Sequence, residues 1–143
     1  MLETEKSYSE YLAAEQRYLS SQNETQREVA NKKIVISILR EISVEPILPI
    51  IRFQLLKIFD RVEFNLFEFG SIQEQAYNTD SDFYLTHCDL VLILTWEDAR
   101  EWDFVNYTKE HLGSIVDEKS IYLEKLLHRI RQHKSCPILL NNY

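Results

Sequence analysis

Four short polar stretches of this 143-residue chain carry side chains suited to binding or transforming a ligand, and each follows a run of apolar residues. They are Arg40-Glu41-Ile42-Ser43, Glu68-Phe69-Gly70-Ser71, Trp96-Glu97-Asp98 and Asn141-Asn142. If the apolar runs are parallel strands, these stretches lie beyond the carboxyl ends of the strands, where open α/β sheets bind their ligands. The candidate ligand-binding residues are therefore Arg40, Glu41, Glu68, Trp96, Glu97, Asn141 and Asn142.

Ser43 is placed like a nucleophile, at the turn between a predicted strand and a predicted helix. A catalytic serine needs a general base, normally a histidine that is oriented by a carboxylate. His87 precedes a predicted strand, whereas the other histidines, His111, His128 and His133, fall within or at the end of a predicted long helix. Ser43 is therefore a catalytic candidate without a visible base, and the alternative is that it caps the helix that follows it.

Arg40 directly follows a predicted buried strand, and its guanidinium group suits the recognition of a carboxylate or a phosphate. It could equally form an ion pair with Glu41, Glu68 or Glu97 across the edge of the sheet. Glu97 and Asp98 could act as an acid/base pair, but adjacent carboxylates are also ordinary in the first turn of a helix. Both alternatives stay open for each group.

Metal and cofactor motifs are not visible in the sequence. The histidines and cysteines lack the spacing of metal ligands, and two glycines in the whole chain exclude the P-loop and the GxGxxG motif. Asp80-Ser81-Asp82 is similar to the DxD motif of aspartyl phosphatases, but no buried strand precedes it, so we interpret it as a polar turn. We predict neither a metal nor a cofactor.

Composition narrows the partners and the compartment. The net charge of −7, without a dense basic cluster, argues against nucleic acid as a partner. No segment reaches the roughly 18 consecutive apolar residues of a membrane span, and the charged amino-terminal segment does not read as a signal peptide. Cys88 and Cys136 adjoin apolar runs and form no CxxC, so we interpret them as reduced core residues of a cytoplasmic protein.

Strand-like and helix-like segments alternate along the chain. The predicted strands are 33–39, 62–67, 89–95 and 137–140, and the predicted helices are 46–59, 72–77 and a long one from about 100 or 106 to 133. This order predicts an α/β three-layer sandwich with a short parallel sheet, of the SGNH or flavodoxin type. Because the chain stops after its last strand, we expect the domain, residues 31–143, to be truncated or completed by another segment.

Residues 1–30 are predicted to form an amphipathic helical extension of this domain. Its apolar and aromatic residues recur at helical spacing, and the stripe is rich in tyrosine. The helix either packs on the edge of its own domain or docks another protein, which includes closing a homo-oligomer. The interface candidates are Tyr8, Tyr11, Leu12, Tyr18 and Leu19.

Several spaced elements between Lys32 and Asn142 together resemble the amino-terminal domain of FkbH-like proteins. The matching elements are Glu45-Pro46 with Pro49, then Phe69-Gly70-Ser71-Ile72-Gln73, then Thr79-Asp80-Ser81-Asp82-Phe83-Tyr84, and then Cys88-Asp89-Leu90-Val91-Leu92. The resemblance implies an SGNH-hydrolase-like α/β sandwich. In that family the domain precedes a phosphatase-like HAD domain, which moves a glyceryl unit from a phosphorylated glycolytic acid to the phosphopantetheine thiol of an acyl carrier protein in polyketide-type biosynthesis.

The sequence departs from that pattern in ways that bear on activity. It has no DxDxT nucleophile motif of a HAD domain, Leu39-Arg40-Glu41-Ile42-Ser43 stands where GDSL would be, and no DxxH follows. The resemblance therefore implies a non-catalytic, SGNH-like domain that supports glyceryl or acyl transfer, with a HAD-type domain or an acyl carrier protein as partner. An acidic carrier would need a local basic patch, for which Arg129, Arg131 and Lys134 are candidates. The alternatives are a small esterase or acyltransferase that uses Ser43, and an oligomerisation or interaction module.

Overall fold

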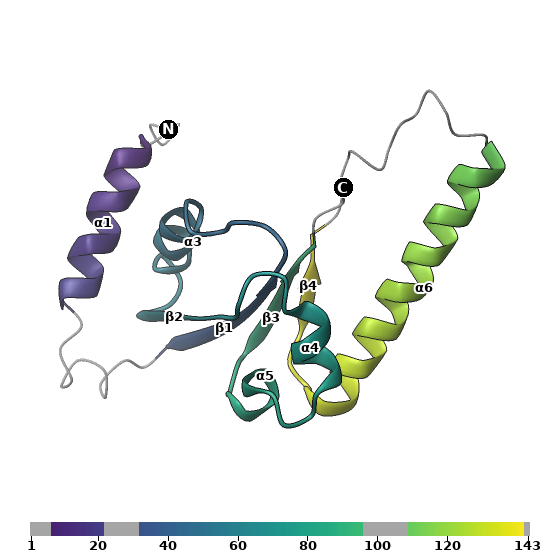
Figure 1. The fold of residues 1–143 in the computed structure, drawn as a ribbon. Helices are drawn as coiled ribbons and strands as arrows, with labels where there is room; N and C mark the ends of the chain where they lie inside the picture. The colour runs from purple at the N-terminus through teal and green to yellow at the C-terminus, as the bar shows by residue number, and fades with distance from the viewer. Residues whose placement is uncertain (1–6, 22–31, 96–108, 142–143) are drawn as a thin grey trace.

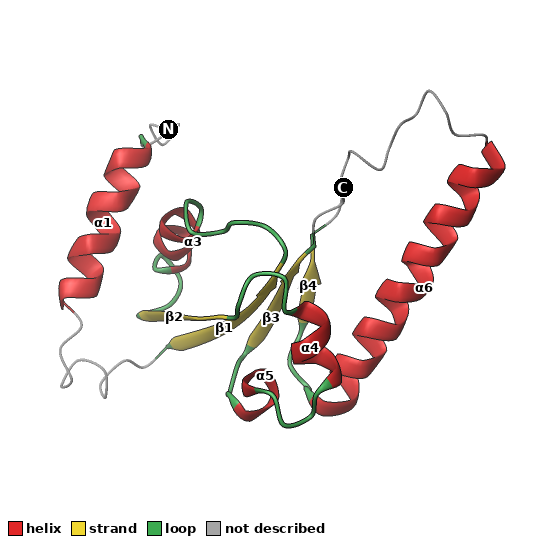
Figure 2. Cartoon of the chain, in the orientation of Figure 1, coloured by secondary structure: helices red, strands yellow, loops and turns green. Residues whose placement is uncertain are grey.

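A four-stranded parallel sheet with helices on both faces forms the centre of the molecule (Figures 1 and 2). The computed structural model describes residues 7–21, 32–95 and 109–141. The strands are β1 (Lys33–Arg40), β2 (Arg61–Leu66), β3 (Leu90–Leu94) and β4 (Ile138–Leu140), in the order β2-β1-β3-β4. The helices are α1 (Tyr8–Ser21), α3 (Leu48–Leu55), α4 (Ile72–Tyr77), α5 (Asp82–Leu85) and α6 (Lys109–His133). The α/β class, the parallel sheet and the layered arrangement predicted from the sequence are confirmed.

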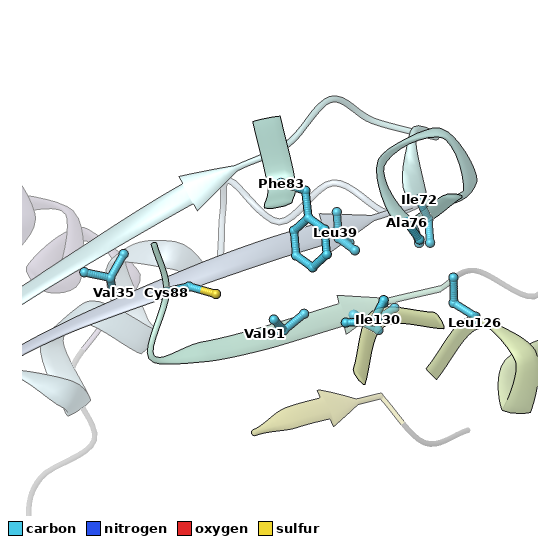
Figure 3. Close-up of a cluster of buried hydrophobic side chains, with 10 residues drawn as sticks. Val35, Leu39, Ile72, Ala76, Phe83, Cys88, Val91, Leu126 and Ile130 are labelled. Carbon is cyan, nitrogen blue, oxygen red and sulfur yellow. The ribbon is translucent and has the colours of Figure 1, made fainter. Parts of the chain in front are cut away.

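Each strand sends alternate side chains to opposite faces of the sheet, as its pleat requires. One face carries Val35 and Leu39 of β1 together with Val91 and Ile93 of β3. These side chains pack against α4, α5 and α6 through Ile72, Ala76, Phe83, Leu126 and Ile130, and Figure 3 shows nearly all of this cluster. Because β1 is buried on both faces, its apolar run is nearly continuous and rich in β-branched residues rather than alternating with polar ones.

The opposite face of the sheet is covered less completely. Ile36, Ile38 and Leu94 are buried there beneath α3 and the turn that contains Val44. Toward the β4 edge the cover ends, and Leu139, which is paired with Leu92 in the register, is 55% exposed. This face therefore remains partly open above β3 and β4 in the part of the chain that the structure describes.

The turn before α3 differs from the sequence prediction. The helix begins at Leu48 with Ile47 at its N-cap position, and no side chain caps it. Residues between Val44 and Leu48 form a turn in which the Ile47 amide donates to the Val44 carbonyl at 2.9 Å. The prediction that Ser43 is the N-cap is therefore wrong, because this turn separates Ser43 from the helix. Pro49 lies in the first turn of α3, where its missing N–H costs nothing.

The Asp80-Ser81-Asp82 segment has turn geometry, as predicted. The backbone amide of Asp80 donates to Oδ1 of Asn78 at 3.0 Å, a side-chain-to-backbone hydrogen bond that is typical of turns. Gln75 of α4 fixes the same segment, since its carbonyl accepts from the Ser81 hydroxyl at 2.8 Å and its side-chain oxygen accepts from the Phe83 amide at 3.1 Å. Asp82 then begins the short helix α5.

Helix α1 packs against α3 and the outer side of β2. Tyr11 and Phe53 meet edge to face with ring centroids 5.4 Å apart. Glu15 forms an ion pair with Arg52 of α3 at 3.0 Å, and both side chains are largely buried. The hydroxyl of Tyr18 accepts from the Val62 amide at 3.1 Å. The predicted helix over residues 2–30 is thus seen over 8–21, and its other residues lie outside the described part of the chain.

Two of the five interface candidates on α1 are therefore used within the chain. Tyr11 and Tyr18 face the α3 and β2 surface, whereas Tyr8, Leu12 and Leu19 are exposed, Leu19 at 55%.

None of the described helices combines the length and the apolar character that a membrane span requires.

Candidate functional site

A pocket of about 390 Å³ lies beyond the carboxyl ends of β1 and β3. These two strands are neighbours, and the chain reverses its direction of travel across the sheet between them, because β2 lies on one side of β1 and β3 on the other. Such a switch point is where open α/β sheets bind ligands. The pocket therefore occupies the position that the fold reserves for a site.

The pocket is lined by residues of three regions. The strand ends contribute Glu41 and Thr95, α4 contributes Gln73, and α6 contributes Glu118, Lys119, Tyr122 and Leu123. Glu41 is held in place by its backbone amide, which donates to the Leu94 carbonyl at 2.7 Å and so extends the contact between β1 and β3 by one residue. Figure 1 shows α6 beside the sheet, where it forms the outer wall of the pocket.

The phenol of Tyr122, which lines this pocket, has a raised pKa. Partial burial raises the pKa of its phenol, a hydrogen bond with Gln73 lowers it, and the nearby charge of Glu41 raises it again. The net shift is upward, so the phenol stays protonated at neutral pH and can donate a hydrogen bond. The pocket thus presents two carboxylates, one ammonium group and three neutral hydrogen-bonding groups.

Arg40 serves the architecture of the strand end. Its Nε donates to the Phe67 carbonyl at 3.2 Å, and its Nη1 forms an ion pair with Glu45 at 2.7 Å. The pKa of Glu45 is lowered, first by a hydrogen bond from its own backbone amide and, among the other causes, by Arg40. The structure thus pairs Arg40 with Glu45, a partner that was not among the three considered from the sequence, and Arg40 does not line the pocket.

Asn141 also has a positioning role at the strand ends. Its Oδ1 accepts from the Thr95 amide at 3.0 Å and its Nδ2 donates to the Thr95 carbonyl at 3.1 Å. The side chain thereby imitates one more residue of β4 and holds Thr95 beside the pocket. Asn141 is therefore close to the site but uses its amide on the backbone.

Glu68 lies in an exposed turn after β2 and does not line the pocket. Its carbonyl accepts from the Ser71 hydroxyl at 2.7 Å. Gly70 closes the turn with φ +76°, a conformation that side chains with a Cβ rarely adopt. The Gly70 amide donates to the Arg40 carbonyl at 2.9 Å, which fixes the start of α4 and hence Gln73. Trp96, Glu97 and Asn142, the remaining ligand-binding candidates, lie outside the described residues.

Ser43 is exposed and does not line the pocket. His87 precedes β3, and His128 and His133 lie in the last turns of α6, at the amino ends of the strands and so at the opposite end of the sheet. The side chain of His111 lies outside the described part. Among the side chains that the structure describes, Ser43 has no histidine beside it. Groups of three or more metal-ligating side chains are likewise absent from the described residues.

The pocket residues on α4 and α6 were not among the sequence candidates. Gln73 was noted only as part of a family-like element, and Lys119 and Tyr122 sit in a helix whose apolar stripe was the visible signal. The rule for strand ends finds residues that follow strands, but it does not say which turn of a covering helix reaches the same place. Lys119 and Tyr122 are three residues apart and so lie on one side of the helix, which was the available signal.

Comparison with known proteins supports the fold. No protein-family model and no curated protein sequence matches the chain. A solved structure matches with a TM-score of 0.66 at 11% sequence identity over 97% of this chain: the N-terminal part of the protein BF1531 from Bacteroides fragilis, containing a phosphatase domain and complexed with Mg. The match covers 34% of that chain, so this chain spans about a third of its length. At this identity the likeness shows a shared fold.

Proposed function

We propose that the chain is a non-catalytic, SGNH-like domain of an FkbH-type protein. In this proposal it supports a phosphatase-type HAD domain that transfers a glyceryl or similar acyl unit to an acyl carrier protein in the cytoplasm. The observation that carries the proposal is the switch-point pocket, which has hydrogen-bonding groups but no nucleophile paired with a histidine among the described side chains. A binding or supporting role fits such a pocket better than hydrolysis does.

The fold likeness is consistent with a partner of this kind. The matched structure contains a phosphatase domain, and the part of it that matches this chain is about a third of its length. The family resemblance in the sequence implies the same pairing of an SGNH-like domain with a HAD domain. The phosphatase activity itself belongs to that protein, and its presence beside this chain is part of the proposal.

The wall of the pocket offers a surface for such a partner. Val116 and Ile121 of α6 are 52% and 50% exposed, and they flank the polar residues Glu118, Lys119 and Tyr122. Apolar side chains next to a few fixed polar groups are typical of protein interfaces. We therefore place the contact with the HAD-type domain on the amino-terminal half of α6, and the reacting acyl unit near the pocket.

A reconstitution tests this function. A HAD-type domain of an FkbH-like protein from the same cell is assayed for glyceryl transfer to a holo acyl carrier protein, with and without this chain. We expect the chain to bind the HAD-type domain and to raise the transfer rate at least tenfold. Ile121→Asp should abolish this gain, whereas Leu85→Asp, at an even more exposed leucine near the other end of the sheet, should not.

Two results would overturn the proposal. One is the absence of binding to both the HAD-type domain and the carrier protein at high micromolar concentrations. The other is turnover of a simple ester by the chain alone that is lost in Ser43→Ala, since that outcome would establish the esterase alternative.

A further inference from the structure

Two cysteine thiols that are far apart in the sequence meet at the amino ends of β3 and β4. Their Sγ atoms are 3.5 Å apart, and both cysteines are free. Cys88 lies two residues before β3 and is 7% exposed, whereas Cys136 lies two residues before β4 and is only partly buried. The sulfur atoms are therefore already in van der Waals contact.

Hydrogen bonds hold the backbone around this pair in place. The Val91 amide donates to the Pro137 carbonyl at 2.9 Å, so β3 and β4 are hydrogen-bonded neighbours at their amino ends. Asp89 fixes the other side, since its Oδ2 accepts from the Val35 amide at 2.8 Å. The β3–β4 register, continued by two residues toward the amino ends, places Cys136 opposite Asp89, so the two cysteines are one residue out of register. Their Sγ atoms nevertheless lie 3.5 Å apart, and a disulfide requires the two side chains to bring them to about 2.05 Å.

One of the two thiols faces a positively charged pocket. Cys136 lines a space of about 410 Å³ together with Arg131, Lys134, Ser135, Pro137 and Ile138. Lys134 donates from Nζ to the Thr86 carbonyl, which holds its charge at the rim of this space. Cys88 does not line the pocket and is buried in the core cluster. A reagent that enters the pocket therefore meets Cys136 first and Cys88 second.

We propose that Cys88 and Cys136 form a reversible disulfide, and that an anionic low-molecular-weight disulfide of the glutathione type is the oxidant. Cys136 loses its proton, and its thiolate attacks one sulfur of the oxidant, forming a mixed disulfide and releasing one thiolate that takes up a proton. The thiolate of Cys88 then attacks Sγ of Cys136 and displaces the second thiolate, which is protonated in turn. The two protein thiols are oxidised by two electrons, and the oxidant is reduced to two thiols.

The charge of the pocket explains the choice of oxidant. Arg131 and Lys134 are the charged groups among its lining residues, and both are cations. An anionic disulfide is attracted there, whereas a cationic one is repelled. The pKa of Cys136 is raised to about 11, mainly by burial and then by Cys88, while Lys134 lowers it slightly. The reaction is therefore slow at neutral pH and should accelerate about tenfold per pH unit until the thiol titrates.

The disulfide would fasten the base of α6 to the sheet. The helix ends at His133, three residues before Cys136, and its buried anchors are Leu126 and Ile130. Closing the loop between residues 88 and 136 also restricts the unfolded chain, which is the usual source of stabilisation by a disulfide. The oxidised protein should therefore unfold at a higher temperature, by roughly 10 °C on the scale of such domains.

The test is incubation of the full chain with glutathione disulfide at pH 8, followed by intact-mass measurement. We expect the wild type to lose about 2 Da without retaining glutathione, to remain a single chain on a non-reducing gel, and to recover its mass with dithiothreitol. Cys88→Ser should stop at the mixed disulfide on Cys136. Cys136→Ser should resist modification, because Cys88 is buried.

Matched oxidants and a charge variant test the role of the pocket. Glutathione disulfide should react at least tenfold faster than neutral hydroxyethyl disulfide, and cystamine should react most slowly. Arg131→Glu should reduce the differences between these three reaction rates or reverse their order. The proposal is overturned if the wild type retains glutathione without closing the internal bond, if it forms only disulfides between chains, or if the cationic oxidant reacts as fast as the anionic one. The wild-type masses decide this even if a serine variant fails to fold.

Discussion

Arg52 connects the amino-terminal helix to the rest of the molecule, and replacing it should release that helix without unfolding the sheet. The guanidinium group forms the ion pair with Glu15 of α1, lies 4.6 Å above the ring of Phe64 and lies 5.4 Å from the ring of Tyr18. The side chains of Arg52 and Glu15 are 12% and 15% exposed. Arg52→Met keeps an unbranched apolar stem but removes the guanidinium group, with its charge and its hydrogen bonds to Glu15 and to the Val62 carbonyl.

The expected magnitude follows from these contacts. Removing one partner of a buried ion pair costs about 3–5 kcal/mol when the other charge has to stay buried. Here α1 can leave the surface and return Glu15 to water, which limits the cost. Loss of the ion pair and of the contact with the Tyr18 ring should together weaken the docking of α1 by about 2–3 kcal/mol, or roughly 30- to 150-fold in the docking equilibrium.

Hydrogen exchange with mass spectrometry measures this directly. Amides of residues 8–21 should exchange roughly 30- to 150-fold faster in Arg52→Met, whereas amides of β1 and β3 should keep their protection. Arg17→Gln is the matched control, because Arg17 is exposed and donates to the Ala13 carbonyl within α1 itself. Unchanged exchange of α1 in Arg52→Met, or an equal change in Arg17→Gln, would refute the reasoning.

Three further predictions follow from packing, backbone geometry and titration. Phe83→Ala should lower the free energy of unfolding by about 3–5 kcal/mol, since Phe83 is fully buried, while Leu85→Ala, at 74% exposure, should change it by less than about 0.5 kcal/mol in urea denaturation. An added Cβ meets no atom within 4 Å at Gly113 of α6 or at Gly70, but only Gly70 has a positive φ. Gly113→Ala should therefore raise the free energy of unfolding by up to about 1 kcal/mol, whereas Gly70→Ala should lower it by about 1–2 kcal/mol. Stability should fall as pH rises from 9 toward 11, because the folded chain keeps the proton of Cys136 with a pKa of about 11 while the unfolded thiol has lost it, and Cys136→Ser should remove this part of the pH profile.

The strands and their order of appearance were predictable because burial on both faces leaves an unmistakable composition. Residues 33–39 and 89–95 were predicted as strands, and β1 and β3 lie at Lys33–Arg40 and Leu90–Leu94. The end of α6 at His133 was equally predictable, because the apolar stripe stops there and Pro137 follows soon after. These features depend on interactions that are local or averaged over a whole face.

The parts that escaped prediction depend on pairings between distant segments. Arg40 had three carboxylates within plausible reach, and its partner Glu45 was decided by the path of the turn before α3. Tyr122 reaches the pocket because of the angle at which α6 crosses the sheet, which periodicity does not encode. The approach of Cys88 to Cys136 depends on β3 and β4 being neighbours in the sheet, which becomes visible only when both strands are placed.

The hydrogen bonding of Tyr18 has a consequence for how the isolated domain would behave. Its hydroxyl group accepts from the amide of Val62 and lies 3.5 Å from the carbonyl oxygen of the same residue, on the side of β2 that faces away from β1. An outermost strand with unoccupied amides and carbonyls recruits strands of other molecules and promotes aggregation. Helix α1 therefore covers part of the exposed edge of β2. A chain that lacks its first thirty residues should associate through the exposed edge of β2 and so show a larger mass in solution. Such an increase would indicate that the strand edge has been uncovered rather than that a new oligomeric interface exists.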